Sequence, residues 1–324
     1  MRHFFYVSIE SVNCTDSIIV WDEVVVVWGN KKIGLALGGG FLRGVAHIGV
    51  LKVLEKHGLK PDLVAGTSAG SIVASLYAAG WSIKKMEKLA LSLRPYQIYD
   101  RWSTVCNLFS IMGSVAADCL RFSWPFTTPL GVMKGKRLDC FLRYHLGDID
   151  FKQLKFTLAI TAVDINSGSK VIFVHQPLFR SMHNQDITFM RDVKVDQAVR
   201  ASTAVPGVFE PKRINNRVLV DGGLREQVPA EVLKALGADV VLAVDVGYDG
   251  ESKEVRNIIH LLVQTLDIIR NDAIKRELDQ SADLVLRPII KDMSPVDFHL
   301  IPHAIAQGEK AALACLPQIK KLFF

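Results

Sequence analysis

The chain has 324 residues, of which 49% are hydrophobic and 22% charged, and its formal net charge is +6. A chain of this length and composition can bury a large core, which argues against an intrinsically disordered protein. The mild basic excess comes without a helix-turn-helix, zinc-finger or RNP pattern. It therefore favours peripheral contact with an anionic membrane over nucleic acid as a partner.

The cysteines are scattered along the chain as Cys14, Cys106, Cys119, Cys140 and Cys315. Their number is odd and none are spaced as CxxC, so the sequence predicts neither a disulfide framework nor a zinc site. We interpret them as reduced thiols of a cytoplasmic protein. We expect no metal and no other cofactor.

Residues 1–30 form a leader of unclear role. They lack the basic start, apolar stretch and small-residue cleavage site of a signal peptide. The apolar run over residues 18–28 contains Asp22 and Glu23. It is too short and too charged to span a bilayer, which takes about 20 apolar residues. Residues 24–27 are interpreted as a strand or as part of the leader.

From Lys31 onward the pattern alternates between strands and helices. A strand is predicted over residues 33–37, and a helix over 44–57 that stops at Gly58. A second strand over 62–65 is followed by a helix of small residues that runs to about residue 79. Strand, turn and helix in repeated order predict a parallel sheet with crossover helices.

The remaining chain continues this α/β pattern. Runs rich in β-branched residues predict buried strands over 156–163, 171–174, 218–220, 240–244 and 284–286. Helices are predicted over 254–279 and 309–322, the second of them kinked or delimited by Pro317. Because there is no internal repeat and no low-complexity linker, residues 31–324 are predicted to form a single domain.

Residues 94–130 differ from the rest because they lack clear periodicity and carry aromatic side chains, such as Trp102 and Trp124, among Pro and Ser. A long irregular segment in a compact domain is usually a lid, a binding loop or an unrecognised helix. We expect either an ordinary cover packed on the sheet, or a lid or membrane-docking surface.

The segment 66–70, Gly-Thr-Ser-Ala-Gly, has the spacing of a nucleophilic turn. A nucleophilic serine stands on a tight turn between strand and helix, where Gly66 and Gly70 on either side of Ser68 let the two backbones pass closely. The positive end of the following helix favours developing negative charge. These five residues alone fit a plain helix start almost equally well.

Three successive glycines, Gly38, Gly39 and Gly40, separate the first predicted strand from its helix. Their N–H groups suit a phosphate or the oxyanion of a tetrahedral acyl intermediate. A dinucleotide site needs G-x-G-x-x-G, but the frame from Gly38 ends on Arg43, and the Gly-Lys-Ser/Thr of a P-loop is absent. The nucleotide interpretations are therefore the weaker ones.

A serine nucleophile needs a neighbouring base to take its proton. Asp164, Asp221 and Asp245 all stand at the ends of predicted strands, where catalytic groups gather. Asp221 is followed by Gly222 and Gly223, which leave its carboxylate uncrowded. The residues alone favour Asp221 without excluding the other two.

A histidine base would be His260, His299 or His303, which follow Asp221 in the order of an α/β-hydrolase triad. None of the three lies in an obvious loop at a strand end. We interpret them as structural histidines.

Taken together, the segments 37–51, 66–70 and 220–223 resemble the patatin-like phospholipase family, close in pattern to its bacterial members. The first is similar to the family's glycine-rich opening, the second to its GxSxG and the third to its Asp-Gly-Gly segment. Two quieter stretches, 161–168 and 201–209, also match. The resemblance runs from about residue 33 to about residue 245.

The resemblance implies a patatin-like three-layer α/β/α fold with a mainly parallel central sheet. It further implies a Ser-Asp dyad without histidine, with Ser68 as nucleophile and Asp221 as general base. The other residues that it assigns to the site are the oxyanion-hole residues Gly38, Gly39, Gly40 and Phe41, and the motif-supporting residues Arg43, Gly44, Gly66, Gly70, Gly222 and Gly223. Arg43 would orient the loop or an anionic group of the substrate.

The sequence departs from the family pattern at two places. Phe41 stands where the family usually has glycine, so its side chain can narrow the pocket or shift an oxyanion donor, a loss worth about a hundredfold or more in rate. Arg225 follows the Asp-Gly-Gly segment, where small or uncharged residues are more usual. Near the dyad it would hold Asp221 ionised and weaken it as a base.

The expected activity is hydrolysis of fatty acyl esters of lipids or phospholipids through an acyl-enzyme, with no metal. The alternatives are a general carboxylesterase or thioesterase, and a regulatory lipid-binding protein with an impaired patatin-like site.

Overall fold

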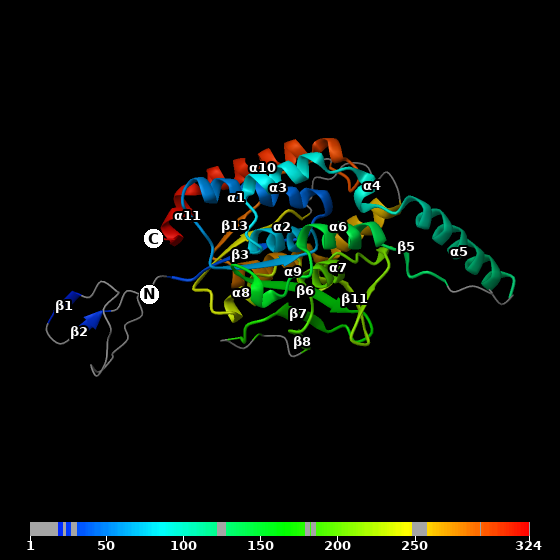
Figure 1. Ribbon diagram of the computed structural model, residues 1–324, viewed down its shortest axis with the longest axis horizontal. Coiled ribbons are helices and arrows are strands. Elements are labelled where there is room, and N and C mark those ends of the chain that lie inside the picture. The colour runs from blue at the N-terminus through cyan, green and yellow to red at the C-terminus, as the bar shows by residue number, and fades with distance from the viewer. Residues whose placement is uncertain are drawn as a thin grey trace. The chain divides into compact units, whose positions relative to one another are not determined.

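The computed structural model describes residues 19–21, 24–26, 31–121, 128–178, 182, 186–247, 258–291 and 293–323 (Figure 1). The chain divides into two compact units, residues 1–31 and 32–324. In the first unit, β1 (Ile19–Trp21) pairs antiparallel with β2 (Val24–Val26). No helix within the described residues is both long enough and apolar enough to cross a membrane.

The second unit is built on a mixed sheet in which strands β13, β12, β3, β4 and β6 are successive parallel neighbours. Strands β11 and β7 pair antiparallel with β6, β8 pairs parallel with β7, and β10 pairs antiparallel with β11. The strands of this sheet are β3 (Ile33–Leu37), β4 (Leu63–Thr67), β6 (Thr157–Asp164), β7 (Lys170–Val174), β8 (Ile187–Met190), β10 (Lys212–Ile214), β11 (Arg217–Asp221), β12 (Val240–Val244) and β13 (Leu284–Leu286). A separate pair joins β5 (Gly131–Met133) to β9 (Gly207–Phe209).

Helices follow most of the parallel strands. The α-helices are α1 (Ala46–Lys56), α2 (Ala69–Ala78), α3 (Ile83–Ser92), α4 (Pro95–Ile98), α5 (Arg101–Cys119), α6 (Lys136–Leu146), α7 (Val195–Ser202), α8 (Ala230–Ala235), α9 (Ile258–Ser281), α10 (Ile301–Ala314) and α11 (Leu316–Phe323). Short 3-10 helices are η1 (Phe41–Val45), η2 (Phe151–Gln153), η3 (Gly222–Leu224) and η4 (Phe298–Leu300).

Both faces of the sheet are covered, because its central strands carry apolar side chains on either side. In β3, Leu35 and Leu37 belong to the core under α1, α2 and α10, whereas Ala36 belongs to the core under α8. In β12, Leu242 and Ala243 divide between the same two cores. Near-continuous apolar strands of this kind are typical of parallel sheets buried on both faces. The predicted α/β fold, with its mainly parallel sheet between helical layers, is confirmed.

The register around β6 brings two strand ends together. Ala162 pairs with Val171 of β7 and with Asp221 of β11, so β7 and β11 lie on opposite edges of β6. Strand β4 also lies opposite β7, and its last residue, Thr67, pairs with Thr161. Strands β4 and β11 therefore share one edge of β6 and run toward each other, with their C-terminal ends opposite successive residues.

The predicted strands agree with the observed ones to within two residues at each end, and the break between α10 and α11 lies just before Pro317. The irregular interpretation of residues 94–130 was wrong for its described part, because α4 and α5 fill most of residues 95–119. Residues 122–127, Trp124 among them, lie outside the described residues. The unrecognised helix is thus confirmed, whereas the roles of cover, lid and membrane-docking surface stay predictions.

Candidate active site

Ser68 lies on a strained turn between β4 and α2. Its backbone has φ 51° and ψ −124°, a left-handed conformation that side-chain-bearing residues rarely adopt, and its side chain is buried. Non-glycine residues are held in such conformations at functional turns when the surrounding structure enforces them. Here the Ser68 N–H donates to Oγ of Ser202, 2.8 Å away at the end of α7.

Asp221 ends β11 beside this turn. Its N–H donates to the carbonyl oxygen of Ala204 at 3.0 Å, and its Oδ1 accepts from the N–H of Gly223 at 2.8 Å. The segment 202–204 thus holds the backbones of both Ser68 and Asp221. Gly222 is required next to Asp221, because any Cβ there would collide with the carbonyl and hydroxyl oxygens of Thr161.

A buried pair of threonines joins the serine turn to the loop after Asp221. Oγ1 of Thr67 lies 2.7 Å from Oγ1 of Thr161 and donates to the carbonyl oxygen of Glu226 at 3.0 Å. Thr67 immediately precedes Ser68. A shift of one loop must therefore move the other, which fixes their relative position.

The glycine loop presents fewer amides than its sequence suggests. The N–H of Gly38 donates to the carbonyl oxygen of Val244, and that of Gly39 to the carbonyl oxygen of Gln227, each at 3.0 Å. The N–H groups of Gly40 and Phe41 have no such acceptor within the described residues. Of the four residues predicted to form an oxyanion hole, the last two have amides available for a ligand.

Three side chains hold this loop, and of these only Arg43 was predicted from the sequence to do so. His47 Nε2 donates to the carbonyl oxygen of Gly38 at 2.8 Å, and Gln227 Nε2 donates to that of Gly39 at 2.8 Å. Complete burial lowers the pKa of His47 to about 4, so its imidazole is neutral at neutral pH. Arg43 Nη1 donates to the carbonyl oxygen of Gly247 at 3.0 Å, and this contact supports the loop-orienting role.

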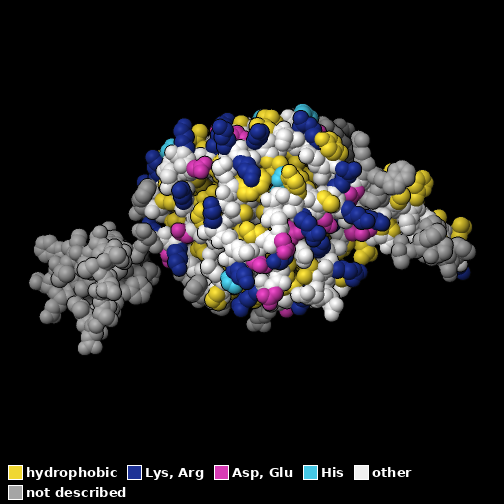
Figure 2. Space-filling view, in the orientation of Figure 1, with side chains coloured by type: hydrophobic (Ala, Val, Ile, Leu, Met, Phe, Trp, Pro, Cys, Tyr) yellow, Lys and Arg dark blue, Asp and Glu magenta, His cyan; other side chains and the backbone are white. Residues whose placement is uncertain are grey.

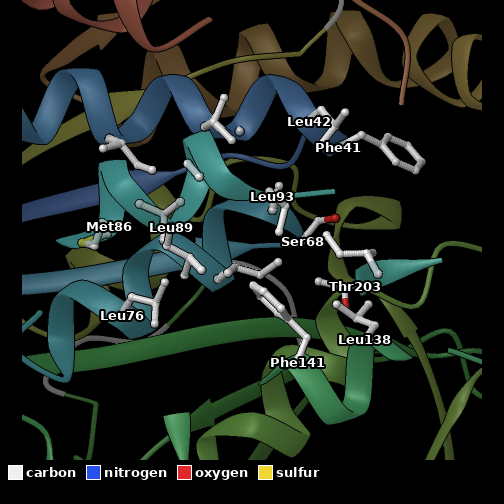
Figure 3. Close-up of a pocket in the computed structure, with 18 of the residues that line it drawn as sticks. Phe41, Leu42, Ser68, Leu76, Met86, Leu89, Leu93, Leu138, Phe141 and Thr203 are labelled. Carbon is white, nitrogen blue, oxygen red and sulfur yellow. The ribbon is translucent and has the colours of Figure 1, made fainter. Parts of the chain in front are cut away.

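Phe41 adopts φ 52°, which favours glycine, at the position where the family usually has one. Its side chain lines the pocket described below (Figure 3).

Arg225 is exposed, and its Nε donates to the carbonyl oxygen of Gly168 at 2.9 Å in the turn between β6 and β7. The described contacts of Arg225 thus involve that turn.

The other strand-end aspartates are engaged by arginines. Asp164 Oδ2 accepts from Arg217 Nη1 at 2.8 Å, and Asp245 Oδ2 lies 3.5 Å from Arg287 Nε. Asp221 differs from both because it ends a strand that meets β4 on the same edge of β6, beside the turn that holds Ser68.

The two candidate histidines whose side chains the structure describes, His299 and His303, do not line the pocket. His299 and His303 are exposed on η4 and α10, and neither is among the residues that line it. No described residue of α9, the helix that contains His260, lines it either. The positions of His299 and His303 therefore do not support a Ser-Asp-His triad.

An apolar pocket of about 130 Å³ extends from Ser68 along α2 (Figure 3). Apolar side chains of η1, α1, α2, α3, α4 and α6 line it, together with Ser68, Tyr99 and Thr203. No charged side chain occurs among the described residues of its lining. The Tyr99 hydroxyl is satisfied by the carbonyl oxygen of Pro295 at 2.6 Å, and burial raises its pKa. The pocket therefore suits a hydrocarbon chain with its reacting end at Ser68.

A buried ionic network lies behind the loop that follows Asp221. Lys170 Nζ is 2.9 Å from Glu226 Oε2 and 3.4 Å from Glu231 Oε2, and both Lys170 and Glu226 are almost fully buried. Carboxylate oxygens of these two glutamates and of Glu277 lie within 4.8 Å of one another. Burial and the charge of Glu226 raise the pKa of Glu277 to about 8. Lys170 already supplies a cation to this acidic cluster.

We expect Lys170→Met to lower the free energy of unfolding by about 3–5 kcal/mol, because it leaves buried carboxylates without their cation. Urea denaturation followed by circular dichroism measures the change. The matched control is Lys234→Met, which removes the partly exposed pair with Asp283 and should cost no more than about 1 kcal/mol. Equal losses in the two variants would contradict this account.

A family model described as patatin-like phospholipase matches residues 35–234. The chain belongs to the patatin-like phospholipase family. Among curated relatives, it is 28% identical over 215 residues to an NTE family protein of Mycobacterium tuberculosis, covering 66% of this chain and 49% of that protein. It is 27% identical over 221 residues to lysophospholipase NTE1 of Eremothecium gossypii, covering 68% of this chain and 12% of that protein. The chain thus spans about half or less of the length of these patatin-like relatives.

Solved structures with a similar chain path include VipD from Legionella pneumophila, with a TM-score of 0.49 and 15% identity over 94% of this chain and 70% of that one. Human GIVD cytosolic phospholipase A2 gives a TM-score of 0.42 and 12% identity over 91% of this chain and 60% of that one.

Proposed function

We propose that this chain is a serine acyl hydrolase that cleaves fatty acyl esters of lipids, with Ser68 as nucleophile and Asp221 as general base. The observation that carries the proposal is the meeting of β4 and β11 on one edge of β6, beside an apolar pocket that ends at Ser68. Family membership supports the same reaction class. The lysophospholipase name of the fungal relative supports a lipid ester as substrate.

In the proposed first step, Asp221 accepts the proton of Ser68 while Oγ attacks the ester carbonyl. The amides of Gly40 and Phe41 then stabilise the oxyanion, helped by the N-terminus of α2. The alcohol leaves with a proton returned by Asp221. Water, activated by the same carboxylate, attacks the acyl-enzyme and releases the fatty acid.

The pocket supports a hydrocarbon chain as the acyl group. Its volume of about 130 Å³ is close to that of an engineered apolar cavity of about 150 Å³ that binds benzene. Leu76 lies two turns beyond Ser68 on α2, about 12 Å along the helix axis. Figure 3 shows Leu76 and Met86 at the end of the pocket farthest from Ser68.

A fluorophosphonate probe tests the proposed nucleophile. A functional dyad should form a covalent adduct that peptide mass spectrometry maps to Ser68, and the same protein should hydrolyse acyl esters of graded chain length. Preference for short esters or thioesters would favour the general esterase alternative. A folded protein that binds lipid but takes no label would favour the regulatory alternative, for which the strained Phe41 backbone is the supporting observation.

Leu76→Trp is expected to slow hydrolysis of long-chain esters at least about tenfold while short-chain esters react as before. The larger ring fills the far end of the pocket, where overpacking costs about 1–3 kcal/mol. The ratio of kcat/KM for the two chain lengths measures the effect. Leu91→Trp is the control, because Leu91 is exposed on α3 outside the pocket lining. An unchanged ratio in Leu76→Trp would place the acyl chain elsewhere.

A further inference from the structure

The apolar side chains of helix α5 face solvent instead of the core. Val105, Leu108, Phe109, Met112 and Val115 recur at helical spacing, and all five are exposed. Phe109 is 71% exposed and Met112 67%. In Figure 2 the hydrophobic side chains of α5 gather at the right-hand end of the view.

The opposite face of α5 is small and polar. Asn107 and Ser114 are buried there, with Ala117 on the same side. Nδ2 of Asn107 donates to the carbonyl oxygen of Gly131 at 3.0 Å, which anchors the helix on β5. An amphipathic helix in a water-soluble fold normally points its apolar stripe inward. This reversed arrangement is unfavourable in water and indicates that another apolar phase covers the stripe.

The start of α5 adjoins both the pocket and a group of cations. Ile98 and Tyr99, which line the pocket, come just before α5.

Asp100 accepts from the backbone N–H groups of Lys136 and Arg137 at 3.0 Å each, which fixes the start of α6 beside the start of α5. Lys134, Lys136 and Arg137 have exposed side chains. The nearby Asp139 is already paired with Lys212 at 3.1 Å.

We propose that α5 docks the protein on an anionic lipid bilayer, with its apolar stripe inserted among the acyl chains and the cations at the start of α6 against the headgroups. Interfacial helices bind membranes by inserting apolar side chains among the acyl chains and by placing basic side chains against the anionic headgroups. Because Ile98 and Tyr99 line the pocket just before α5, docking through α5 would bring the pocket close to the lipid. This goes beyond the proposed hydrolysis, because binding would persist with lipids that cannot be hydrolysed.

The test is co-sedimentation of the full chain with vesicles of ether-linked phosphatidylglycerol and phosphatidylcholine, which contain no scissile acyl ester. We expect binding that weakens as salt is raised and that weakens on vesicles of ether-linked phosphatidylcholine alone. The double variant Phe109→Glu/Met112→Glu should partition at least about tenfold more weakly, because two apolar side chains leave the acyl region.

The matched control is Ile289→Glu/Leu313→Glu, which changes two exposed apolar residues outside α5 and should bind as the parent does. Hydrolysis of a water-soluble short-chain ester reports the dyad separately from docking, and circular dichroism reports folding. Absence of vesicle binding by the parent chain, or equal binding by the α5 variant, would overturn the proposal. A parent chain that forms a dimer and does not bind vesicles, and that becomes monomeric in the α5 variant, would also overturn the proposal. In that case a second copy of the chain would cover the stripe.

Discussion

Ser68→Ala is expected to abolish ester hydrolysis, with a fall in kcat on the order of a millionfold, as when other serine hydrolases lose their nucleophile. The turn that holds Ser68 is strained, at φ 51° and ψ −124°, so the fold keeps the hydroxyl at the end of an apolar pocket at an energetic cost. Alanine keeps this backbone and removes the attacking oxygen. Steady-state kinetics with a chromogenic acyl ester and loss of fluorophosphonate labelling measure the effect.

Ser75→Ala provides the matched control for this substitution. Ser75 is buried in the same helix, α2, and its hydroxyl has no hydrogen-bond partner within the described residues. Removing an unsatisfied hydroxyl should leave both activity and stability nearly unchanged. If Ser68→Ala retained the activity of Ser75→Ala, another residue would be the nucleophile.

Asp221→Asn is expected to lower kcat on the order of ten-thousandfold, the loss typical of removing the acidic member of a catalytic set. The amide cannot accept the proton of Ser68, whereas its shape still allows the contact with the N–H of Gly223. Ser68 should also lose most of its reaction rate with a fluorophosphonate. Kinetics under saturating substrate separate this loss from a change in KM.

Asp245→Asn tests whether the effect belongs to Asp221 specifically. Asp245 also stands at a strand end, but it is paired with Arg287 and should not be needed for proton transfer. Its variant is expected to keep its activity within about tenfold of the parent. Greater loss in Asp245→Asn than in Asp221→Asn would reverse the assignment of the base.

The regular part of the fold follows from local patterns. The strands over residues 33–37 and 240–244 are predicted with their observed ends, because each is a short apolar run bounded on both sides by charged residues or glycine. Helix α5 was missed for a physical reason. Its apolar stripe faces solvent and its inner face carries small and polar side chains, so the usual division between an apolar inner face and a charged outer face is absent.

The sequence identifies the segments that bear Ser68 and Asp221, because glycine spacing and strand ends are local features. It does not reveal that His47, Gln227 and Ser202 hold those segments in place. These contacts join residues far apart in the chain, and a lone polar residue gives no sign of its distant partner. For the same reason the sequence does not show that the N–H groups of Gly38 and Gly39 are already hydrogen-bonded to distant carbonyl oxygens.

By itself the amino-acid sequence determined the α/β class, the order of the strands along the chain, and the two turns that offer a hydroxyl and a carboxylate. The tertiary structure decided that β11 runs head-on toward β4 along β6, that the amides of Gly38 and Gly39 are taken up by Val244 and Gln227, and that the apolar face of α5 points outward. Local propensity and patterning act over a few residues. Register, hydrogen-bond partners and exposure depend on which distant segments meet, and these are settled when the core packs.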